Sequence, residues 1–407
     1  MTPDSDHSLF AGIKPLELAA YVESECERFG VSQRQFSEAV GIGRRSIQRI
    51  LGGEAQKVDA FLLYNVAQFF GISPDELIRR AVMADEAKRT QANVAARYGF
   101  IARNFDLQRL KRIGFIESTA DWEGIESRIV EFFGYGSVFE YGDELPRTAF
   151  SRTVHNPSAD MRRFWMSSVH HQFKQLTAGA PPFNRGGLEA LLPKTRAYTT
   201  DVERGFTAFV RALYRLGVLV LVESYVTTTA VYGATLEVDG RPCVVLTNRD
   251  KRYDRLWRTL AHELCHVLFD LDLIRREGYH ISSQEPDLLS PYIEERADAF
   301  AADLFVPPAV RAEVAPVISV PLAVEVHARK LPVDPSLVYG LHLDVTLAGA
   351  PSDVRSAEYA KYRGDRIRPS TPALHAFPNL DTPSWQKTSL AETVPLIRSA
   401  IAPLTPS

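Results

Sequence analysis

The chain has 407 residues, of which 45% are hydrophobic and 24% are charged, and its 47 basic and 50 acidic side chains leave a formal net charge of −3. These values are ordinary for a globular protein of roughly two to three domains, and they exclude a wholly disordered chain, a collagen-like repeat and a disulfide scaffold. The balanced charge also excludes a protein that coats nucleic acid non-specifically, so any contact with DNA must come from a local basic patch.

The cysteines and the N-terminus both favour the cytoplasm. Cys26, Cys243 and Cys265 form no C-x-x-C pair, which is typical of a protein from a reducing compartment. Residues 1–14 carry acids before any apolar run, so they do not read as a signal peptide and are expected to be a flexible N-terminus. The longest apolar run, 216–222, is too short to span a bilayer. We expect a cytoplasmic protein with no membrane partner.

Residues 15–82 contain the start and stop signals of several short helices. Ser32 followed by Gln35 is a capping box that predicts the start of one helix, and Gly41 separates that helix from the next. Apolar residues recur at helical spacing on each side of Gly41. This segment has the layout of a helix-turn-helix: a helix, a tight turn at a glycine and then a second helix, GRRSIQRIL.

The segment after Gly41 is rich in side chains that read DNA. Arginine makes bidentate hydrogen bonds to guanine, glutamine makes them to adenine, and both side chains also bind phosphate. Ile47 and Ile50 are expected to face the core of this helix, which leaves the polar residues outside. The alternative is that the arginines simply form the solvent-exposed face of a helix and bind no DNA. The expected DNA-binding residues are Arg44, Arg45, Ser46, Gln48 and Arg49.

This part of the chain resembles a known family. VSQRQFSEAVGIGRRSIQRILGG and the following KVDAFLLYNVAQFFGISPDELIRRAV are similar to the lambda-repressor-like, Xre-type helix-turn-helix, over about residues 15–82. Gly43 stands where that family usually has a capping Ser or Thr, so the cap of the recognition helix is weaker. The resemblance implies operator DNA as a partner, read as two half-sites by a homodimer.

Residues 83–200 predict a helical connector that carries no clear functional signal. Helical spacing is evident at 87–98 and at 121–133, whereas the glycines and prolines of 176–200 predict a loop or linker. The adjacent pair His170–His171 does not predict a metal site, because neighbouring residues on a helix point about 100° apart.

Residues 201–345 combine a small sheet with two motif-bearing helices. After a helical stretch, β-type runs occur at 217–222, 231–238 and 242–247. Asp239–Gly240 between the last two predicts a hairpin, which we expect to present an edge strand to an extended substrate. A long helical pattern follows directly and carries the chemistry.

That helical pattern contains the motif H-E-x-x-H. His262 and His266 are four residues apart, so both imidazoles lie on one face and can reach one zinc ion. Glu263 is left free to act as a general base on a water molecule. The alternative is an amphipathic helix with two surface histidines.

A second helical segment, PYIEERADAFAADLFVP, offers a third ligand. Glu294 and Asp298 are four residues apart and share a face. A zincin site built from two histidines and one glutamate takes its carboxylate ligand from a later helix. Asp298 is then placed to accept the free N–H of a ligating histidine and fix its tautomer.

The hairpin, HELCH and EERADAFAADLFVP together resemble the ImmA/IrrE metallopeptidase family, over about residues 203–345. The resemblance implies a zincin-like fold, one Zn²⁺ held by His262, His266 and Glu294, and Glu263 as the catalytic general base. Glu295 points about 100° away from its neighbour and is not the expected ligand. Cys265 stands where the family often has Gly, and we interpret it as a small packed residue.

Two further features are less well defined. Tyr279 and His280 lie in the predicted loop between the two motifs and are candidate transition-state stabilisers. The proline-rich tail, 346–407, is expected to form loops or an extended arm with parts docked on the body.

The sequence therefore predicts an α+β multidomain fold, with an all-α helix-turn-helix bundle, a helical middle region and a C-terminal zincin-like domain. Two functions are compatible with it. One is a DNA-binding transcriptional regulator whose zinc metallopeptidase domain hydrolyses a peptide bond in a regulatory partner protein. The other is an antitoxin-like or sensory repressor, as in a toxin–antitoxin pair, whose zincin fold binds a partner or ligand with little proteolysis.

Overall fold

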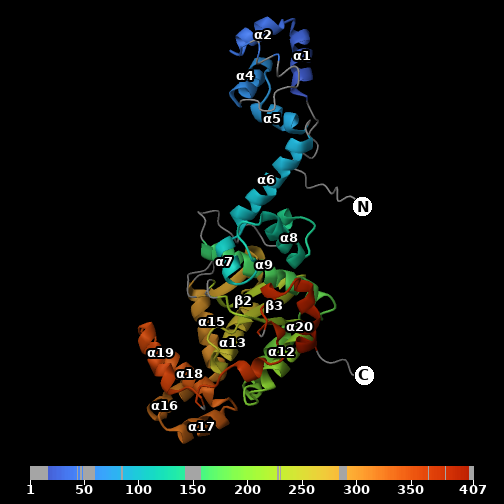
Figure 1. Ribbon diagram of the computed structural model, residues 1–407. Coiled ribbons are helices and arrows are strands. Elements are labelled where there is room, and N and C mark those ends of the chain that lie inside the picture. The colour runs from blue at the N-terminus through green and yellow to red at the C-terminus, as the bar shows by residue number, and fades with distance from the viewer. Residues whose placement is uncertain are drawn as a thin grey trace. The chain divides into compact units, whose positions relative to one another are not determined.

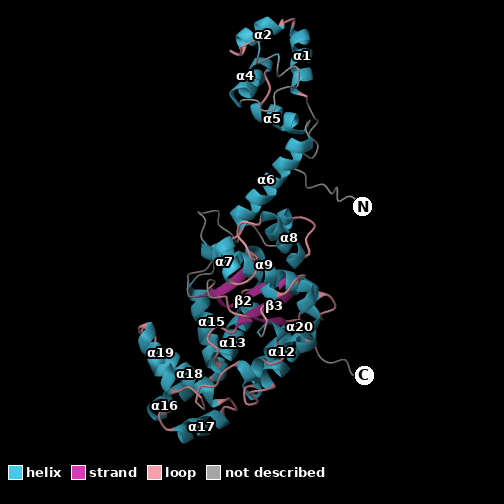
Figure 2. Ribbon diagram, in the orientation of Figure 1, coloured by secondary structure: helices cyan, strands magenta, loops and turns pink. Residues whose placement is uncertain are grey.

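The structure is a computed structural model, and it describes residues 17–43, 45, 48, 60–83, 86–142, 157–226, 229, 231–283, 291–364, 366–380 and 382–402. The chain divides into two compact units, residues 1–103 and residues 104–407. Figures 1 and 2 show the elements of each unit, and the units are described separately below. Within the described ranges, no helix is both long enough and apolar enough to cross a membrane.

The first unit is helical. Its described helices are α1 (Leu18–Phe29), α2 (Gln33–Ala39), α4 (Ala60–Phe70), α5 (Pro74–Met83) and α6 (Glu86–Asn104). The capping box that begins α2 is confirmed, because Ser32 Oγ accepts from the Gln35 amide at 3.3 Å and Gln35 Oε1 accepts from the Ser32 amide at 2.9 Å. Helix α1 ends at Gly30, whose φ of 65° is the left-handed conformation that glycine adopts without strain.

A small apolar core holds α1, α2, α4 and α5 together. It is built from buried residues that recur at helical spacing, and Phe36 of α2 stacks on Phe70 of α4 with ring centroids 5.4 Å apart. The chain turns after α2 at Gly41, which has a φ of 71°. The core residues are Val22, Cys26, Phe36, Val40, Leu62, Val66, Ala67, Phe70 and Leu77.

In the second unit, helices surround a four-stranded sheet. The strands are β1 (Leu219–Glu223), β2 (Val231–Val238), β3 (Arg241–Thr247) and β4 (Tyr279–Ser283). Its α-helices are α7 (Leu107–Arg112), α8 (Trp122–Phe133), α9 (Pro157–Thr177), α10 (Arg185–Leu191), α11 (Thr195–Tyr198), α12 (Gly205–Arg215), α13 (Tyr253–Phe269), α14 (Leu271–Glu277), α15 (Pro291–Phe305), α16 (Pro308–Val314), α17 (Pro321–Lys330), α18 (Pro335–Thr346), α19 (Ser352–Lys361) and α20 (Thr393–Ile401). The predicted mixture of an all-helical first part and a helix-covered small sheet is confirmed.

The strand order is β1-β3-β2-β4, with β1 parallel to β3 and both other pairs antiparallel. The predicted hairpin is present as β2 and β3, joined at Asp239 and Gly240, whose φ angles of 50° and 72° suit a two-residue primed turn. The expectation that this hairpin offers an edge strand is wrong. Both of its strands are interior, because β4 pairs with the outer side of β2, and the predicted loop that contains Tyr279 and His280 is this edge strand.

The two faces of the sheet are covered by different helices. Thr235 of β2 points to α13, where its hydroxyl donates to Glu263. Glu223, at the end of β1, points to the other face and accepts from Gln172 of α9. Because side chains alternate along a strand, α13 and α9 pack on opposite faces. His280 pairs with Thr235 in the register and therefore shares its face.

Two stretches for which the sequence predicts loops contain short helices. In 176–200, which the glycines and prolines predicted to be a loop, α10 begins where the Asn184 side chain accepts from the Gly187 amide at 2.8 Å. In the C-terminal segment, prolines stand at helix starts and in 3-10 turns, where a missing N–H costs little. The 3-10 turns of this segment are Thr371–Leu374, Pro378–Leu380, Ser384–Gln386 and Leu390–Glu392. The first two contain a proline, and Pro383 directly precedes the third.

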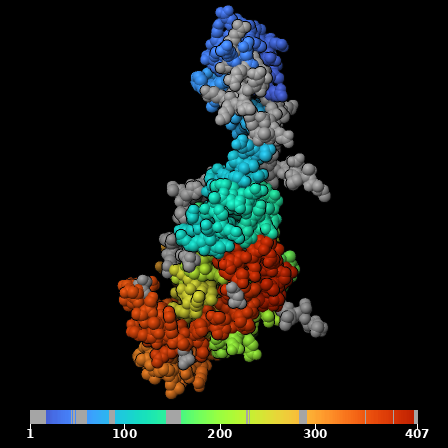
Figure 3. Space-filling model, in the orientation of Figure 1, coloured from blue at the N-terminus to red at the C-terminus, as the bar shows by residue number. Residues whose placement is uncertain are grey.

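The C-terminal segment packs against the helices of its own unit. In Figure 3 its residues, in red, meet the segment that contains α8, in green. The guanidinium of Arg128 on α8 donates to three backbone oxygens of this segment, those of Trp385, Lys387 and Thr388, at 2.9, 2.6 and 2.7 Å. The segment is thus bound to the body by charge-assisted hydrogen bonds to backbone carbonyls.

Candidate metal centre and DNA-binding surface

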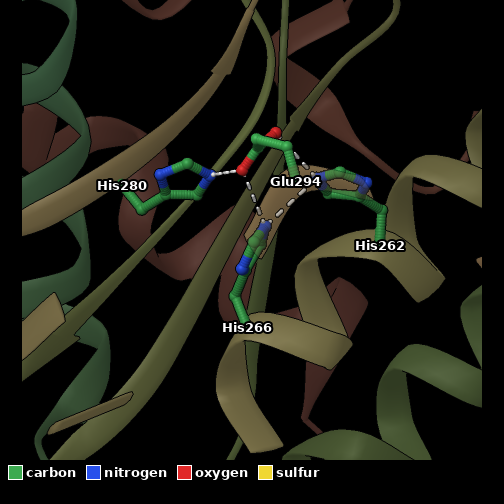
Figure 4. Close-up of side chains that lie close together, drawn as sticks. All are labelled: His262, His266, His280 and Glu294. Atoms are coloured by element: carbon green, nitrogen blue, oxygen red, sulfur yellow. Dashed lines mark hydrogen bonds and ion pairs between the residues drawn. The ribbon is translucent and has the colours of Figure 1, made fainter. Parts of the chain in front are cut away.

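Helix α13 brings two histidines together. It packs its apolar side on β2 and β3, and His262 and His266, one turn apart, are buried with exposed fractions of 8% and 0%. Their Nε2 atoms lie 3.1 Å apart (Figure 4). The spacing of the motif therefore places two imidazole nitrogens at one point, as the sequence predicts.

Helix α15 packs along α13 and contributes a carboxylate to the same point. Glu294 Oε2 lies 3.5 Å from His262 Nε2, and Glu294 Oε1 lies 3.4 Å from His266 Nε2. The neighbouring Glu295 is exposed and does not belong to this group. The orientation of α15 therefore turns Glu294, and not Glu295, toward the two histidines, as the sequence predicts.

His280 of β4 is the fourth member of the cluster. Its Nε2 lies 2.8 Å from Glu294 Oε1, and its ring centroid lies 4.3 Å from that of His266 (Figure 4). One ligand-type atom from each of His262, His266, His280 and Glu294 falls within 4.8 Å of the others, so this buried group can hold a metal ion. The sequence indicated His280 as a candidate stabiliser but did not place it among the ligand-type atoms.

Two carboxylates orient the histidines of α13. Asp298 Oδ1 lies 2.8 Å from His262 Nδ1, and Asp270 Oδ2 lies 2.9 Å from His266 Nδ1. A carboxylate at Nδ1 holds its proton and leaves Nε2 free for a metal. Asp270, which also pairs with Arg296 at 2.6 Å, was missed by the sequence analysis. Its position four residues after His266 was the signal that could have found it.

The electrostatics of the cluster favour an ionised carboxylate. Burial alone would raise the pKa of Glu294, but its contacts with His262 and His280 hold that pKa well below the usual range. Burial lowers the pKa of His262, yet Asp298 and Glu294 outweigh it and raise the pKa to about 10. Burial dominates at His266 and lowers its pKa. A cation in this group therefore meets an ionised Glu294 carboxylate, and its binding releases a proton from His262.

Glu263 lies beside the cluster and is held by the sheet. Its carboxylate is fully buried, and Oε2 accepts from the Thr235 hydroxyl at 2.7 Å. Oε1 has no hydrogen-bond partner among the described residues. Gly233 leaves room for it, because a Cβ at that position would stand 2.6 Å from Oε1. One carboxylate oxygen is thus fixed and the other is left with an unused acceptor.

Cys265 shows the properties of a packed thiol. It has no exposed surface, and burial raises its pKa to about 11. It is not a member of the metal-capable group found among the described residues. A neutral thiol of this kind is neither a ligand nor a reactive nucleophile, which supports the interpretation made from the sequence.

The predicted recognition helix is described only in part. Arg45 and Gln48 are helical and exposed, and they follow the turn at Gly41. Arg44, Ser46 and Arg49 lie outside the described residues. Arg45 and Gln48 therefore stand where side chains can reach a partner.

Comparison with known families identifies both domains. Residues 22–77 match the family described as Helix-turn-helix, and residues 214–317 match the family described as IrrE N-terminal-like domain. No curated protein and no solved structure matches the chain significantly. Helices α18, α19 and α20 lie beyond both matched segments. The chain therefore carries an Xre-type helix-turn-helix domain, which implies DNA binding, and a metallopeptidase-like IrrE N-terminal-like domain with a buried histidine–glutamate cluster.

Proposed function

We propose that this protein is a DNA-binding transcriptional regulator whose second unit is a zinc peptidase that hydrolyses a peptide bond in a regulatory partner protein. The first unit binds operator DNA, as a homodimer on two half-sites, through the predicted residues that include Arg45 and Gln48. We place the protein in the cytoplasm, where operator DNA lies.

The donor set fits one zinc ion. Ligand atoms about 2.0–2.1 Å from a tetrahedral zinc ion stand about 3.3 Å from one another. His262 Nε2 and His266 Nε2 stand 3.1 Å apart, and Glu294 places Oε2 3.5 Å from the first of these nitrogens and Oε1 3.4 Å from the second. We assign these three residues as ligands, with Asp298 as the partner that orients His262. This match of distances is the observation that carries the proposal.

A zinc ion in such a site acts as a Lewis acid that activates water and polarises a carbonyl group. The chain supplies the proton transfers. Glu263 Oε1, which has an unused acceptor, takes a proton from the attacking water and later delivers it to the leaving nitrogen. Thr235 keeps the other carboxylate oxygen in place, so that Oε1 is presented in one orientation.

His280 is assigned the role of the group that stabilises the developing oxyanion. Its Nε2 stands 2.8 Å from Glu294 Oε1, which is a hydrogen-bond distance and shorter than the spacing of two zinc ligands. A buried imidazole N–H at that place is positioned to donate to negative charge that forms next to the ligands.

The second candidate function is supported by the same residue. If His280 becomes a fourth ligand, four protein ligands close the site, as in structural zinc sites. The second unit then binds a partner or ligand without hydrolysis, and the protein acts as an antitoxin-like or sensory repressor.

Peptide hydrolysis distinguishes the two functions. The zinc-loaded full chain and its Glu263→Gln variant are incubated with a proteome-derived peptide library, and new termini are identified by mass spectrometry. The peptidase predicts cleavage by the parent and none by the variant, although both bind zinc. Equal zinc content without cleavage in either sample contradicts the peptidase and leaves the second candidate.

DNA binding is tested separately. Selection of bound fragments from a random DNA library, followed by titration at several salt concentrations, gives the operator and the number of phosphate contacts. Arg45→Ala and Gln48→Ala are expected to weaken the selected site by about tenfold each. Unchanged affinity in both variants contradicts the assignment of this surface.

A further inference from the structure

A cleft of about 600 Å³ opens beside the metal cluster. His262 and Glu294 line it, together with Leu341 and Val345 of α18 and Tyr359 of α19. The residues of α18 and α19 lie beyond the segment that matches the IrrE N-terminal-like domain. Any peptide that reaches the cluster through this cleft contacts these residues.

The cleft has an excess of positive charge away from the cluster. Glu294 and Asp298 face His262, and among the described residues Asp344 is the only other acid that lines the cleft. The remaining charged residues that line it are Arg255, Arg258, Arg311 and Arg355. Asp250 and Asp344 pair with Arg255, and Asp303 pairs with Arg311. The positive charge that is left for an anionic ligand therefore lies at Arg258 and Arg355.

Arg258 is a cation of the cleft whose guanidinium is incompletely paired. Its side chain is only 8% exposed, and Nη2 donates to Asp344. Nη1 is buried and has no hydrogen-bond partner among the described residues. Asp344 cannot supply one easily, because it also receives the Tyr359 hydroxyl and pairs with Arg255 at 3.4 Å. A buried N–H without an acceptor is costly, and a ligand carboxylate removes that cost.

The position of Arg258 relates this unused donor to the metal cluster. It precedes His262 by four residues on α13, which is one turn or about 6 Å along the helix. Peptide residues in an extended chain advance about 3.3 Å each. A carboxylate at Arg258 therefore belongs within about three residues of the bond that lies at the cluster.

A second cation in the cleft has no partner of its own. Arg355 of α19 is exposed and lines the cleft, and its side chain makes no ion pair or hydrogen bond within the described part of the chain. Arg311 differs, because Asp303 pairs with it at 2.5 Å. Arg311 thus provides a matched control on the same cleft.

We propose that the cleft binds acidic peptides, with Arg258 and Arg355 recognising a carboxylate close to the scissile bond. This inference rests on the proposed peptidase function and names its class of substrate. The carboxylate belongs either to an Asp or Glu side chain or to the C-terminus of the substrate. Apolar neighbours of that carboxylate are accommodated by Leu341 and Val345.

Peptide hydroxamates test the proposal by binding rather than by turnover. A leucine-like succinyl hydroxamate is coupled to glutamine amide, to glutamate amide, or to glutamine with a free carboxyl group. A second pair, acetyl-Glu-Leu-hydroxamate and acetyl-Gln-Leu-hydroxamate, extends on the other side of the metal-binding group. The Kd of each probe for the zinc-loaded full chain is measured by calorimetry.

We expect at least one acidic probe to bind tenfold or more tightly than its neutral counterpart. The glutamate amide and the free carboxyl probe distinguish a side chain from a C-terminus. Arg258→Gln should abolish the preference, Arg355→Gln should reduce it about threefold, and Arg311→Gln should leave it unchanged. Arg355→Gln changes an exposed residue, so the test stands even if Arg258→Gln does not fold.

Equal Kd values for all acidic and neutral probes in the parent protein would overturn the inference and leave the peptidase function intact. A preference that survives in both Arg258→Gln and Arg355→Gln would overturn the assignment of these residues. If a single-stranded oligonucleotide displaces the acidic probes at lower concentration than an acidic peptide does, the cleft binds nucleic acid instead. Failure of even the neutral hydroxamates to bind contradicts the proposed function itself, and the inference falls with it.

Discussion

The Thr235 hydroxyl donates to Glu263 Oε2 at 2.7 Å, and this bond joins an interior strand of the sheet to the helix that carries both histidines. The bond fixes the orientation of Glu263, the proposed base. Its Oε2 is held by Thr235, and only Oε1 can accept a proton. The bond also explains why β2 has glycine at position 233, where a Cβ would collide with Oε1. The sheet is thus part of the site rather than only its support.

Thr235→Val removes the hydroxyl and keeps the shape of the side chain. We expect kcat to fall by about tenfold, because Glu263 is no longer held in one orientation. The zinc content and KM should stay within twofold, since the Thr235 hydroxyl bonds to Glu263 and not to His262, His266 or Glu294. Steady-state kinetics on a peptide from the cleavage library provide the measurement.

Thr235→Ser is the matched control, because it restores the hydroxyl. It should recover most of the lost kcat. A valine variant with full activity would show that the bond does not position the base.

His280→Ala separates stabilisation of the oxyanion from metal binding. Our assignment predicts about one zinc per chain in the variant and a fall in kcat of about 10²–10³-fold, the usual effect of losing one oxyanion donor. Metal analysis and kinetics on the same sample give both values. Loss of the zinc together with the activity would instead identify His280 as a ligand and would favour the second candidate function.

The buried Glu223 predicts a dependence of stability on pH. Burial raises its pKa from 4.5 to about 7, although bonds from Gln172, Ser384 and Asn379 offset part of that effect. The folded state therefore binds this proton more tightly than the unfolded chain does. The contribution of Glu223 to the free energy of unfolding falls as the pH rises from 4.5 to about 7, by roughly 3 kcal/mol, and stays low above pH 7.

Glu223→Gln cannot ionise and should lack this decrease. The free energy of unfolding of the variant minus that of the parent should rise by about 2–3 kcal/mol between pH 5 and pH 8. Urea unfolding at several pH values measures it. A difference that is independent of pH would mean that Glu223 does not titrate in this range.

Arg128 is predicted to hold the C-terminal segment in place. Its guanidinium donates to three carbonyls of that segment and to Phe115 O at 3.1 Å. Arg128→Ala should lower the free energy of unfolding by about 2–4 kcal/mol, because four backbone carbonyls, three of them in partly buried bonds, lose their donor. Limited proteolysis should cut the variant first near residues 384–390.

Arg398→Ala is the control for this prediction. Arg398 donates to one carbonyl, that of Gln175, at 2.8 Å. Its loss should cost about 1 kcal/mol or less and should not expose the segment. Equal effects of the two substitutions would contradict the specific role of Arg128.

The parts of the site that the sequence predicted are those set by helical periodicity. His262 and His266, and then Glu294 and Asp298, are four residues apart, and that spacing alone places each pair on one face. Asp270 follows the same rule from His266 and could have been included. His280 could not, because its place depends on the register of β4 against β2, where it pairs with Thr235.

The fold was harder to predict where contacts are distant in sequence. The five-residue strand β4 has too few residues for a clear alternation, and without it the hairpin was wrongly expected at the edge of the sheet. The C-terminal segment is ordered by pairs such as Glu223 with Asn379 and Arg128 with Trp385, which no local pattern reveals. Its prolines alone predicted loops.

The central claim, that α13 and α15 together hold one zinc ion, is tested most directly by metal stoichiometry. Native mass spectrometry of the zinc-loaded full chain, of Glu263→Gln and of His266→Ala measures it in one series. We predict one zinc per chain in the first two and less than about a tenth of that in His266→Ala, because two remaining ligands bind zinc poorly. An absence of zinc in the parent chain, or retention of a full equivalent in His266→Ala, would contradict the account.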